Sequence, residues 1–187
     1  VKPGKPTIIA LIKNTLIIGL PGYPTSALSI FNLFVKPIIM KLSGKILDPS
    51  ETIEGQISQK IVRSIGRKEL LPINLVKKGK TFSAYPIIKG SGSITTLSEA
   101  DGFIEIPENK TILEEGEKVK INLLPNVKPA NLMIIGSHCV GIDLLLELIK
   151  EKNDTILTKV INVGSLGGIN AIKRGEADIA RIHVLDE

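Results

Sequence analysis

The sequence predicts a mixed α/β chain of three segments, and three patterns support this. Residues 1–46 combine short apolar strands with a Gly/Pro loop and a helical pattern, which is an α/β unit. Residues 47–125 hold many short strands between glycine and proline turns, which favours a small β-barrel or sandwich. Residues 131–187 alternate strand and helix as βαβαβ, which predicts the start of a parallel-sheet domain. With 187 residues, 43% of them apolar, the chain can bury a core.

In the first segment, Thr7–Ile12 and Thr15–Leu20 are β-branched and leucine-rich runs around a polar Lys13-Asn14 turn, so they predict two strands. A tight loop, Pro21-Gly22-Tyr23-Pro24, follows them. Apolar residues then recur at helical spacing: Ala27, Leu28, Ile30, Phe31, Phe34, Val35 and Ile38.

The ends of that helix also carry signals. Thr25 or Ser26 is expected to act as its N-cap, because a hydroxyl can accept from the first free N–H groups. Pro37 is expected to kink the helix or end its first part, since it has no N–H and its ring crowds the preceding turn. Gly44 is expected to close it.

In the second segment, four runs predict strands: Gln56–Ile61, Leu70–Val76, Thr81–Pro86 and Val119–Leu124. Four glycines are expected to punctuate them: Gly79, Gly90, Gly92 and Gly102. Ile94–Glu99 fits one helical turn.

The third segment follows an expected linker at residues 125–129. Its predicted strands are Leu132–Ile135, Thr158–Val163 and Ile179–His183, and its predicted helices are Ile142–Lys150 and Ile169–Arg174. Two Gly/Ser loops, Gly136-Ser137-His138 and Gly164–Gly168, follow strands and precede helices.

Composition narrows the class of function. Aromatic residues make up only 3% of the chain, which argues against a surface that stacks single-stranded nucleic acid. The formal net charge is +5, and the first 46 residues hold six lysines and no acid. This excess is either a solvated lysine surface or a local positive field that attracts an anionic substrate.

The single cysteine, Cys139, cannot form an intramolecular disulfide, so a reducing compartment fits. The apolar runs are far shorter than the roughly 20 residues of a membrane span. We therefore expect a cytoplasmic protein without a membrane partner. Cys139 itself is expected to be buried and inert.

The loop at Gly19–Ser26 joins a strand to a helix, and such a junction can bind an anion through backbone N–H groups. Pro21 and Pro24 stiffen it but remove two donors, so it is not a generic phosphate loop. A rigid turn with a purely structural role is an equal alternative. Upstream, Lys2 and Lys5 lie on a stiff Lys-Pro-Gly-Lys-Pro segment, which on its own is most often a solvated basic loop.

Together, Lys-Pro-Gly-Lys-Pro, the Gly-Leu-Pro-Gly-x-Pro-x-Ser loop and the helix with Phe31, Phe34 and Pro37 resemble the end of the pterin-binding domain of the MoeA and gephyrin E-domain family. The resemblance implies insertion of molybdate or tungstate into adenylylated molybdopterin, with release of AMP. It also implies the substrate-contacting residues Lys2, Lys5, Pro21, Gly22, Pro24 and Ser26. The family usually has Asn, which tolerates left-handed backbone angles, where Tyr23 stands.

The second segment resembles the small C-terminal β domain of the same family at Gly66–Glu69, Gly90–Ser93 and Gly116–Val119. This implies a homodimer in which Arg67 and Ser91 contact substrate across the interface. A surface salt bridge is the commoner role for Arg67, and dimerisation alone could be the purpose of this domain.

The third segment resembles the beginning of a periplasmic-binding-protein-like domain of the molybdate-binding kind. The two Gly/Ser loops meet at the carboxyl edge of the predicted sheet, where N–H groups and hydroxyls can hold an oxyanion. The candidate residues are Ser137, His138, Ser165 and Gly167, although tight βα turns alone would explain the Gly and Ser content.

Two readings of function remain open. In the first, the chain is part of a molybdopterin molybdotransferase, not active alone, because the Mg²⁺ ligands that the family carries are not expected within it. In the second, it is a non-catalytic module that binds or senses molybdate or tungstate. His138 and His183 have no third partner at zinc spacing, so no metal site is predicted.

Overall fold

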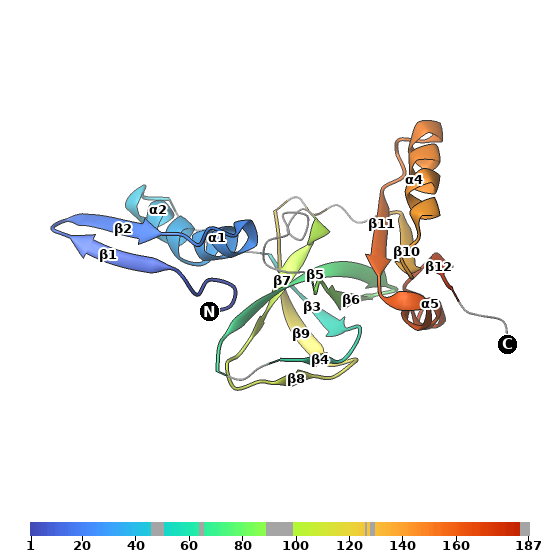
Figure 1. Cartoon of the computed structure of the whole chain (residues 1–187), viewed down its shortest axis with the longest axis horizontal. Helices are drawn as coiled ribbons and strands as arrows, with labels where there is room; N and C mark the ends of the chain where they lie inside the picture. The colour runs from blue at the N-terminus through green and yellow to red at the C-terminus, as the bar shows by residue number, and fades with distance from the viewer. Residues whose placement is uncertain (46–50, 64–65, 89–98, 126, 128–129, 184–187) are drawn as a thin grey trace. The chain divides into compact units, whose positions relative to one another are not determined.

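The computed structural model describes residues 1–45, 51–63, 66–88, 99–125, 127 and 130–183 (Figure 1). Contacts between Cα atoms divide the chain into two compact units. Unit 1 comprises residues 1–74 and 86–125, and unit 2 comprises residues 75–85 and 126–187. The expected linker at residues 125–129 lies largely outside the described residues.

Unit 1 begins with an antiparallel hairpin of β1 (Ile8–Ile12) and β2 (Thr15–Gly19), with Ile8 opposite Gly19. Lys13 lies in the turn at φ 54°, so the predicted two strands and their polar turn are confirmed. Both faces of the hairpin expose large apolar side chains: Ile8, Ile9, Leu11, Ile12, Leu16 and Ile17.

A helical run follows as α1 (Pro24–Ile30), a five-residue π-helical segment η1 (Phe31–Val35) and α2 (Lys36–Leu42). The Lys36 N–H donates to the Phe31 carbonyl, five residues back, as a π-turn requires. This wider turn lies directly before Pro37, whose missing N–H and bulky ring an α-helical turn would not accommodate. The predicted irregularity at Pro37 thus takes the form of a change from the π-helix η1 to the α-helix α2 at the residue before it.

The predicted N-cap was wrong. Tyr23 caps the helix, with no side-chain hydrogen bond, and Pro24 occupies the first turn, where its fixed φ is already helical. Thr25 and Ser26 lie inside the helix and are buried. At the other end, Ser43 and then Gly44, at φ 69°, close the run as expected.

The helical run Pro24–Leu42 is long and apolar enough to cross a membrane when judged by length and composition, with a mean hydropathy of 1.3. A core helix of a globular protein passes the same test, so this is weak evidence. No other helix among the described residues passes it.

The second segment forms a closed barrel, not a sandwich, in the order β3-β6-β5-β7-β9. Its strands are β3 (Thr52–Ile57), β5 (Glu69–Lys78), β6 (Thr81–Pro86), β7 (Gly102–Ile106) and β9 (Lys118–Leu123). A two-stranded pair, β4 (Ile61–Val62) with β8 (Ile112–Leu113), accompanies it. The barrel interior is mainly isoleucine and leucine, including Ile57, Leu71, Ile73, Ile104 and Ile121.

Two strand predictions needed correction. Gln56–Ile61 is not one strand, because the polar residues 58–60 separate β3 from β4. Gly102 does not mark a turn but starts β7, where a Cβ would lie 2.5 Å from the Asn122 carbonyl oxygen of β9. Gly102 therefore allows close strand contact. The expected helical turn at Ile94–Glu99 lies outside the described residues except for Glu99.

Unit 2 contains the predicted parallel sheet. β10 (Leu132–Gly136) is central, between β11 (Thr158–Asn162) and β12 (Ile179–Arg181), with both pairings parallel. The helices are α4 (Val140–Lys152) and α5 (Gly164–Lys173). The βαβαβ prediction is confirmed.

Helix α5 begins five residues earlier than predicted, so the expected Gly164–Gly168 loop is its first turn. Gly168 allows this helix to pack closely on the sheet, because a Cβ there would lie 2.8 Å from the Ile135 carbonyl oxygen. Ile135 and Ile161 of the sheet pack with Ala171 of α5 and with Val76 and Tyr85 in a buried apolar cluster. Val76 and Tyr85 belong to the β5–β6 segment that groups with unit 2.

We expect Gly136→Ala to destabilise unit 2 strongly. Gly136 has φ 153°, and a Cβ would lie 2.2 Å from the Arg181 carbonyl oxygen. The strained backbone should cost more than about 1 kcal/mol, and overpacking about 1–3 kcal/mol more. Hydrogen exchange of the β10 amides with increasing urea would measure the loss.

Gly141→Ala is the matched control. Its Cβ would make only an ordinary 3.6 Å contact with the Cys139 Sγ, in the first turn of α4. Alanine is favoured over glycine in a helix by up to about 1 kcal/mol, so stability should hold or rise. Equal protection in both variants would contradict the close contact at Gly136.

Candidate functional site

Within the Gly19–Ser26 loop, the backbone is extended at Tyr23, the residue that stands where the sequence analysis expected Asn and a left-handed conformation was in question. Tyr23 has φ −78° and ψ 129°, so this position requires no left-handed conformation. Its carbonyl accepts from the Ala27 N–H at 2.9 Å, which begins the helix, while its ring is 62% exposed. Pro21 and Ser26 are buried, and Gly22 is exposed. The loop therefore exposes Gly22 and Tyr23 to solvent between the buried residues Pro21 and Ser26.

The Lys2–Pro6 segment packs against the helix that the loop introduces. Gly4 has φ 139°, and a Cβ there would lie 2.5 Å from the Ile30 Cδ1, so a substitution would strain the backbone and displace the Ile30 side chain. The Thr7 hydroxyl and N–H both donate to the Gly4 carbonyl, at 2.7 and 3.1 Å. The structure thus brings the Lys2–Pro6 segment into contact with the end of α1, the helix that follows the loop.

Lys2 and Lys5 have different surroundings. The Lys2 backbone pairs with Lys68 and Leu70, and its Nζ lies 3.5 Å from the Glu69 carboxylate. Glu69 also lies 3.5 Å from the Arg63 Nε, so it is shared by two cations. Lys5 is exposed. Of the two lysines, Lys5 is the more available to an anion.

Of the two candidates from the second segment, the structure describes only Arg67. Arg67 is exposed on the connection between β4 and β5. Ser91 lies outside the described residues.

The candidates of the third segment lie at the carboxyl edge of the parallel sheet, as expected. The Ser137 N–H donates to the Arg181 carbonyl at 2.9 Å, and His138 is exposed. The Ser165 hydroxyl accepts from the His183 N–H at 2.9 Å and lies 3.2 Å from the His183 carbonyl, so it ties the chain after β12 to α5. Gly167 lies within α5 against Val163.

Sequence reasoning missed two residues at this edge. Asn162 ends β11 and Arg181 ends β12, and the Arg181 Nη2 donates to the Asn162 Oδ1 at 2.7 Å. A polar side chain at the end of each apolar strand was the available signal. Cys139, expected to be buried, is half-buried at the N-cap of α4.

Unit 2 also contains a buried carboxylate that the sequence did not reveal. Glu176 is 4% exposed and accepts hydrogen bonds from the Ser83 hydroxyl at 2.7 Å, the Tyr85 hydroxyl at 2.5 Å and the Arg174 Nε at 2.8 Å. The Arg174 Nη2 lies 3.1 Å from the Tyr85 hydroxyl. Glu176 follows α5, whose end has the Schellman pattern: Glu176 N–H to Ala171 and Gly175 N–H to Ile172.

These contacts set the ionisation of the cluster. Burial alone would raise the pKa of Glu176, but hydrogen bonds from Tyr85, Ser83 and Arg174 outweigh it and hold the pKa below its ordinary value. Burial raises the pKa of Tyr85 far above its ordinary value, and Glu176 adds to this. An ionised Glu176 beside a neutral tyrosine is a structural anchor.

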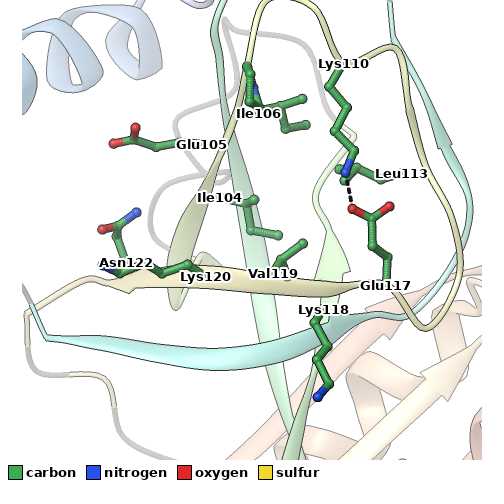
Figure 2. Close-up of a pocket in the computed structure, with 11 residues that line it drawn as sticks. Ile104, Glu105, Ile106, Lys110, Leu113, Glu117, Lys118, Val119, Lys120 and Asn122 are labelled. Carbon is green, nitrogen blue, oxygen red and sulfur yellow. Dashed lines mark hydrogen bonds and ion pairs between the residues drawn. The ribbon is translucent and has the colours of Figure 1, made fainter.

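One open hollow in unit 1, of about 390 Å³, lies over β7 and β9 (Figure 2). Figure 2 shows the Lys110 amine directed at the Glu117 carboxylate, and this ion pair lowers the pKa of Glu117. None of the candidate site residues lines the hollow, although Glu117, Lys118 and Val119 of the Gly116–Val119 motif do. In the described part of the chain, no group of three or more His, Cys, Asp or Glu side chains could hold a metal ion.

Comparison with known proteins agrees with these segments. Residues 54–124 match the MoeA C-terminal region (domain IV), and residues 146–187 match the PBP superfamily domain. The resemblance to the MoeA family, with a PBP-like segment after it, is therefore confirmed.

Individual relatives extend the likeness. The chain is 27% identical over 130 residues to a molybdopterin molybdenumtransferase of Nostoc sp., covering 66% of this chain and 30% of that protein. A MoeA crystal structure from Pyrococcus horikoshii is 43% identical, with a TM-score of 0.53, over 65% of this chain and 29% of that one. A molybdenum cofactor biosynthesis protein from Pyrococcus furiosus is 28% identical, with a TM-score of 0.54, over 66% and 42%. The chain spans less than a third of the length of the curated relatives.

We expect Glu176→Gln to lower the free energy of unfolding of unit 2 at pH 7 by about 1–3 kcal/mol, because an amide satisfies fewer of the three buried donors. Since the folded pKa is below the unfolded value of about 4.3, the carboxylate's contribution is present above that pH and is lost as pH falls through the folded pKa. Urea unfolding at pH 7 and 3.5 should show the wild-type advantage shrinking at the lower pH.

Glu114→Gln is the control, since this exposed acid pairs only at the surface with Lys60. It should change stability by less than about 0.5 kcal/mol. A Glu176→Gln effect as small as that of Glu114→Gln would mean that the buried cluster does not stabilise unit 2.

Proposed function

We propose that this chain, which carries the C-terminal region of a MoeA-type protein, serves in molybdenum cofactor biosynthesis. In this proposal it forms part of an enzyme that inserts molybdate or tungstate into adenylylated molybdopterin and releases AMP. The main support for this proposal is the length of the chain over which it is similar to its relatives. The Nostoc relative aligns with 66% of the chain, which is more than residues 54–124 can account for, so the likeness reaches beyond the barrel.

The N-terminal motifs supply the physical support. Gly4 and Ile30 hold the lysine segment against the helix that starts at the Gly-Pro loop. Two prolines fix that loop before substrate arrives, so little entropy would be lost on binding. Lys2 and Lys5 would lie near the phosphate or the oxyanion. Pro21, Gly22 and Pro24 would shape the rim of the site, and Ser26 would contact the anion.

The remaining parts of the proposal come from the resemblance. Arg67 and Ser91 would contact substrate across a homodimer interface, and the protein would work in the cytoplasm. The Mg²⁺ that the resemblance implies does not fit the described residues, which offer no cluster of acidic ligands. We therefore assign no step in this chain to Mg²⁺.

A second candidate function applies to unit 2, where the segment after residue 130 would bind molybdate or tungstate without catalysis. The match of residues 146–187 to the PBP superfamily domain favours it, together with a parallel sheet whose strand ends carry polar groups. Ser137, His138, Ser165 and Gly167 would surround the oxyanion.

The test of the first proposal is complementation. The gene product that contains this chain should restore molybdoenzyme activity in a host that lacks its own MoeA-type protein. Lys5→Ala should lower that activity about 10- to 100-fold, since a hydrogen bond to a charged group contributes about 1.5–3 kcal/mol. Lys41→Ala, an exposed lysine on α2, should not lower it. Stable expression without complementation would refute the proposal.

Calorimetry tests the second candidate separately. Titration of the chain with molybdate and tungstate should give saturable heat if unit 2 is an oxyanion module. If neither molybdate nor tungstate gives heat, this function is excluded, and the complementation result is unaffected.

A further inference from the structure

The three strands of unit 2 end in one row. The parallel register places Gly136 of β10 opposite Asn162 of β11 on one side and Arg181 of β12 on the other. Side chains in register on neighbouring parallel strands lie on the same face of a sheet. Asn162 and Arg181 therefore share a face, with a residue that has no side chain between them.

Gly136 keeps that row open. A Cβ would lie 2.2 Å from the Arg181 carbonyl oxygen and 2.6 Å from its nitrogen, so no other residue fits without a shift. Arg181 reaches across β10 and donates from Nη2 to the Asn162 Oδ1 at 2.7 Å. This contact fixes the guanidinium at the carboxyl edge of the sheet.

The guanidinium is not satisfied there. Arg181 is 9% exposed, yet its Nε and Nη1 have no hydrogen-bond partner among the described residues. Buried polar atoms are nearly always paired, and a buried cation without an acceptor is costly. Burial also lowers the pKa of Arg181, against the opposing influence of Cys139 and Asp143. Two hydrogen-bond donors of Arg181, Nε and Nη1, are therefore without an acceptor among the described residues.

Two helices begin at the same edge. Helix α4 has 13 residues and α5 has 10, and each follows a strand of the parallel sheet. Neither N-cap residue, Cys139 or Val163, makes a capping hydrogen bond with its side chain. Helix N-termini at the carboxyl ends of parallel strands favour a bound anion. The Ser137 N–H donates to the Arg181 carbonyl, so the turn before α4 lies beside the Arg181 backbone, and the charges of Cys139 and Asp143, at the start of α4, act on the guanidinium.

Among the described residues, one carboxylate acts on Arg181. Asp143 is in the first turn of α4 and is exposed. Its charge acts on Arg181, but the described structure contains no ion pair between them within 4.0 Å. Asp143 therefore competes with an anion for Arg181 without satisfying its free donors.

We propose that Arg181 anchors a small tetrahedral oxyanion at the carboxyl edge of the unit 2 sheet, together with Asn162 and the N-terminus of α4. The oxyanion is a free ion of the sulfate, phosphate or molybdate type, or the phosphate group of a larger ligand. This inference rests on the second candidate function and names its anchoring residue. The Nε and Nη1 atoms are the Arg181 donors that remain for the anion, because Nη2 already donates to Asn162.

The single cysteine of the chain offers a local readout. Cys139 is half-buried at the N-cap of α4, so the rate of its alkylation by iodoacetamide reports on this site alone. In the full chain, sulfate, phosphate, molybdate and tungstate are titrated one at a time, and AMP serves as a phosphate monoester. At least one of them should slow alkylation saturably.

Arg181→Gln should weaken that protection at least about tenfold, because it removes a charged donor pair. Lys173→Gln, which removes an exposed cation at the opposite end of α5, should leave it unchanged. Asp143→Asn should strengthen binding about two- to fivefold by removing the competing charge. Protection by AMP alone would identify the ligand as a phosphate ester, whereas protection by the inorganic ions would identify a free oxyanion.

Three outcomes would overturn the inference. The first is no protection of Cys139 by any of the five anions, and the second is equal protection in wild type and Arg181→Gln. The third applies if circular dichroism shows that Arg181→Gln does not fold, and it is an anion affinity in Asp143→Asn equal to that of the wild type. If the first outcome is found while calorimetry detects molybdate binding, only this anchor is overturned and the oxyanion module itself stands.

Discussion

Unit 2 depends most on one buried carboxylate. Removing a carboxylate from water carries a penalty of several kcal/mol unless it is fully hydrogen-bonded. Glu176 meets that condition with three donors, two of them, Ser83 and Tyr85, on β6 and one, Arg174, at the end of α5. The bonds hold residues 75–85 to the C-terminal segment. They also explain why contacts group a stretch of barrel strands with the parallel sheet.

A second constraint is the close approach of backbones, which glycine alone permits. Gly168 brings α5 against β10, and Gly136 brings β10 against the end of β12. Both lie where the sheet meets the first turns of its helices. Because Gly136 has no side chain, the Arg181 guanidinium can reach across β10 and donate to Asn162 at the carboxyl edge.

Local pattern was enough to predict the hairpin, a second segment built of short strands and the βαβαβ order, because each depends on the spacing of apolar residues, but it left a barrel and a sandwich equally open. Three details were beyond it. A proline within a helical pattern can end the helix, kink it or follow a π-turn, and a single sequence does not show which of these occurs at Pro37. Gly102 resembles a turn residue unless its neighbour on β9 is known. The Tyr85–Glu176 contact joins residues 91 positions apart, for which a single sequence carries no signal. The predicted site residues were recognisable by motif, whereas the Asn162–Arg181 pair was not.

The hairpin of β1 and β2 has a consequence for the behaviour of this chain in solution. A two-stranded hairpin is at best marginally stable in water, and this one exposes Ile8, Leu11 and Ile12 at 58–71%. In the described part of the chain, each of its two strands has one edge without a neighbouring strand, and an apolar edge of this kind is a template for pairing between molecules. We therefore expect the hairpin to favour self-association of the 187-residue chain as its concentration rises.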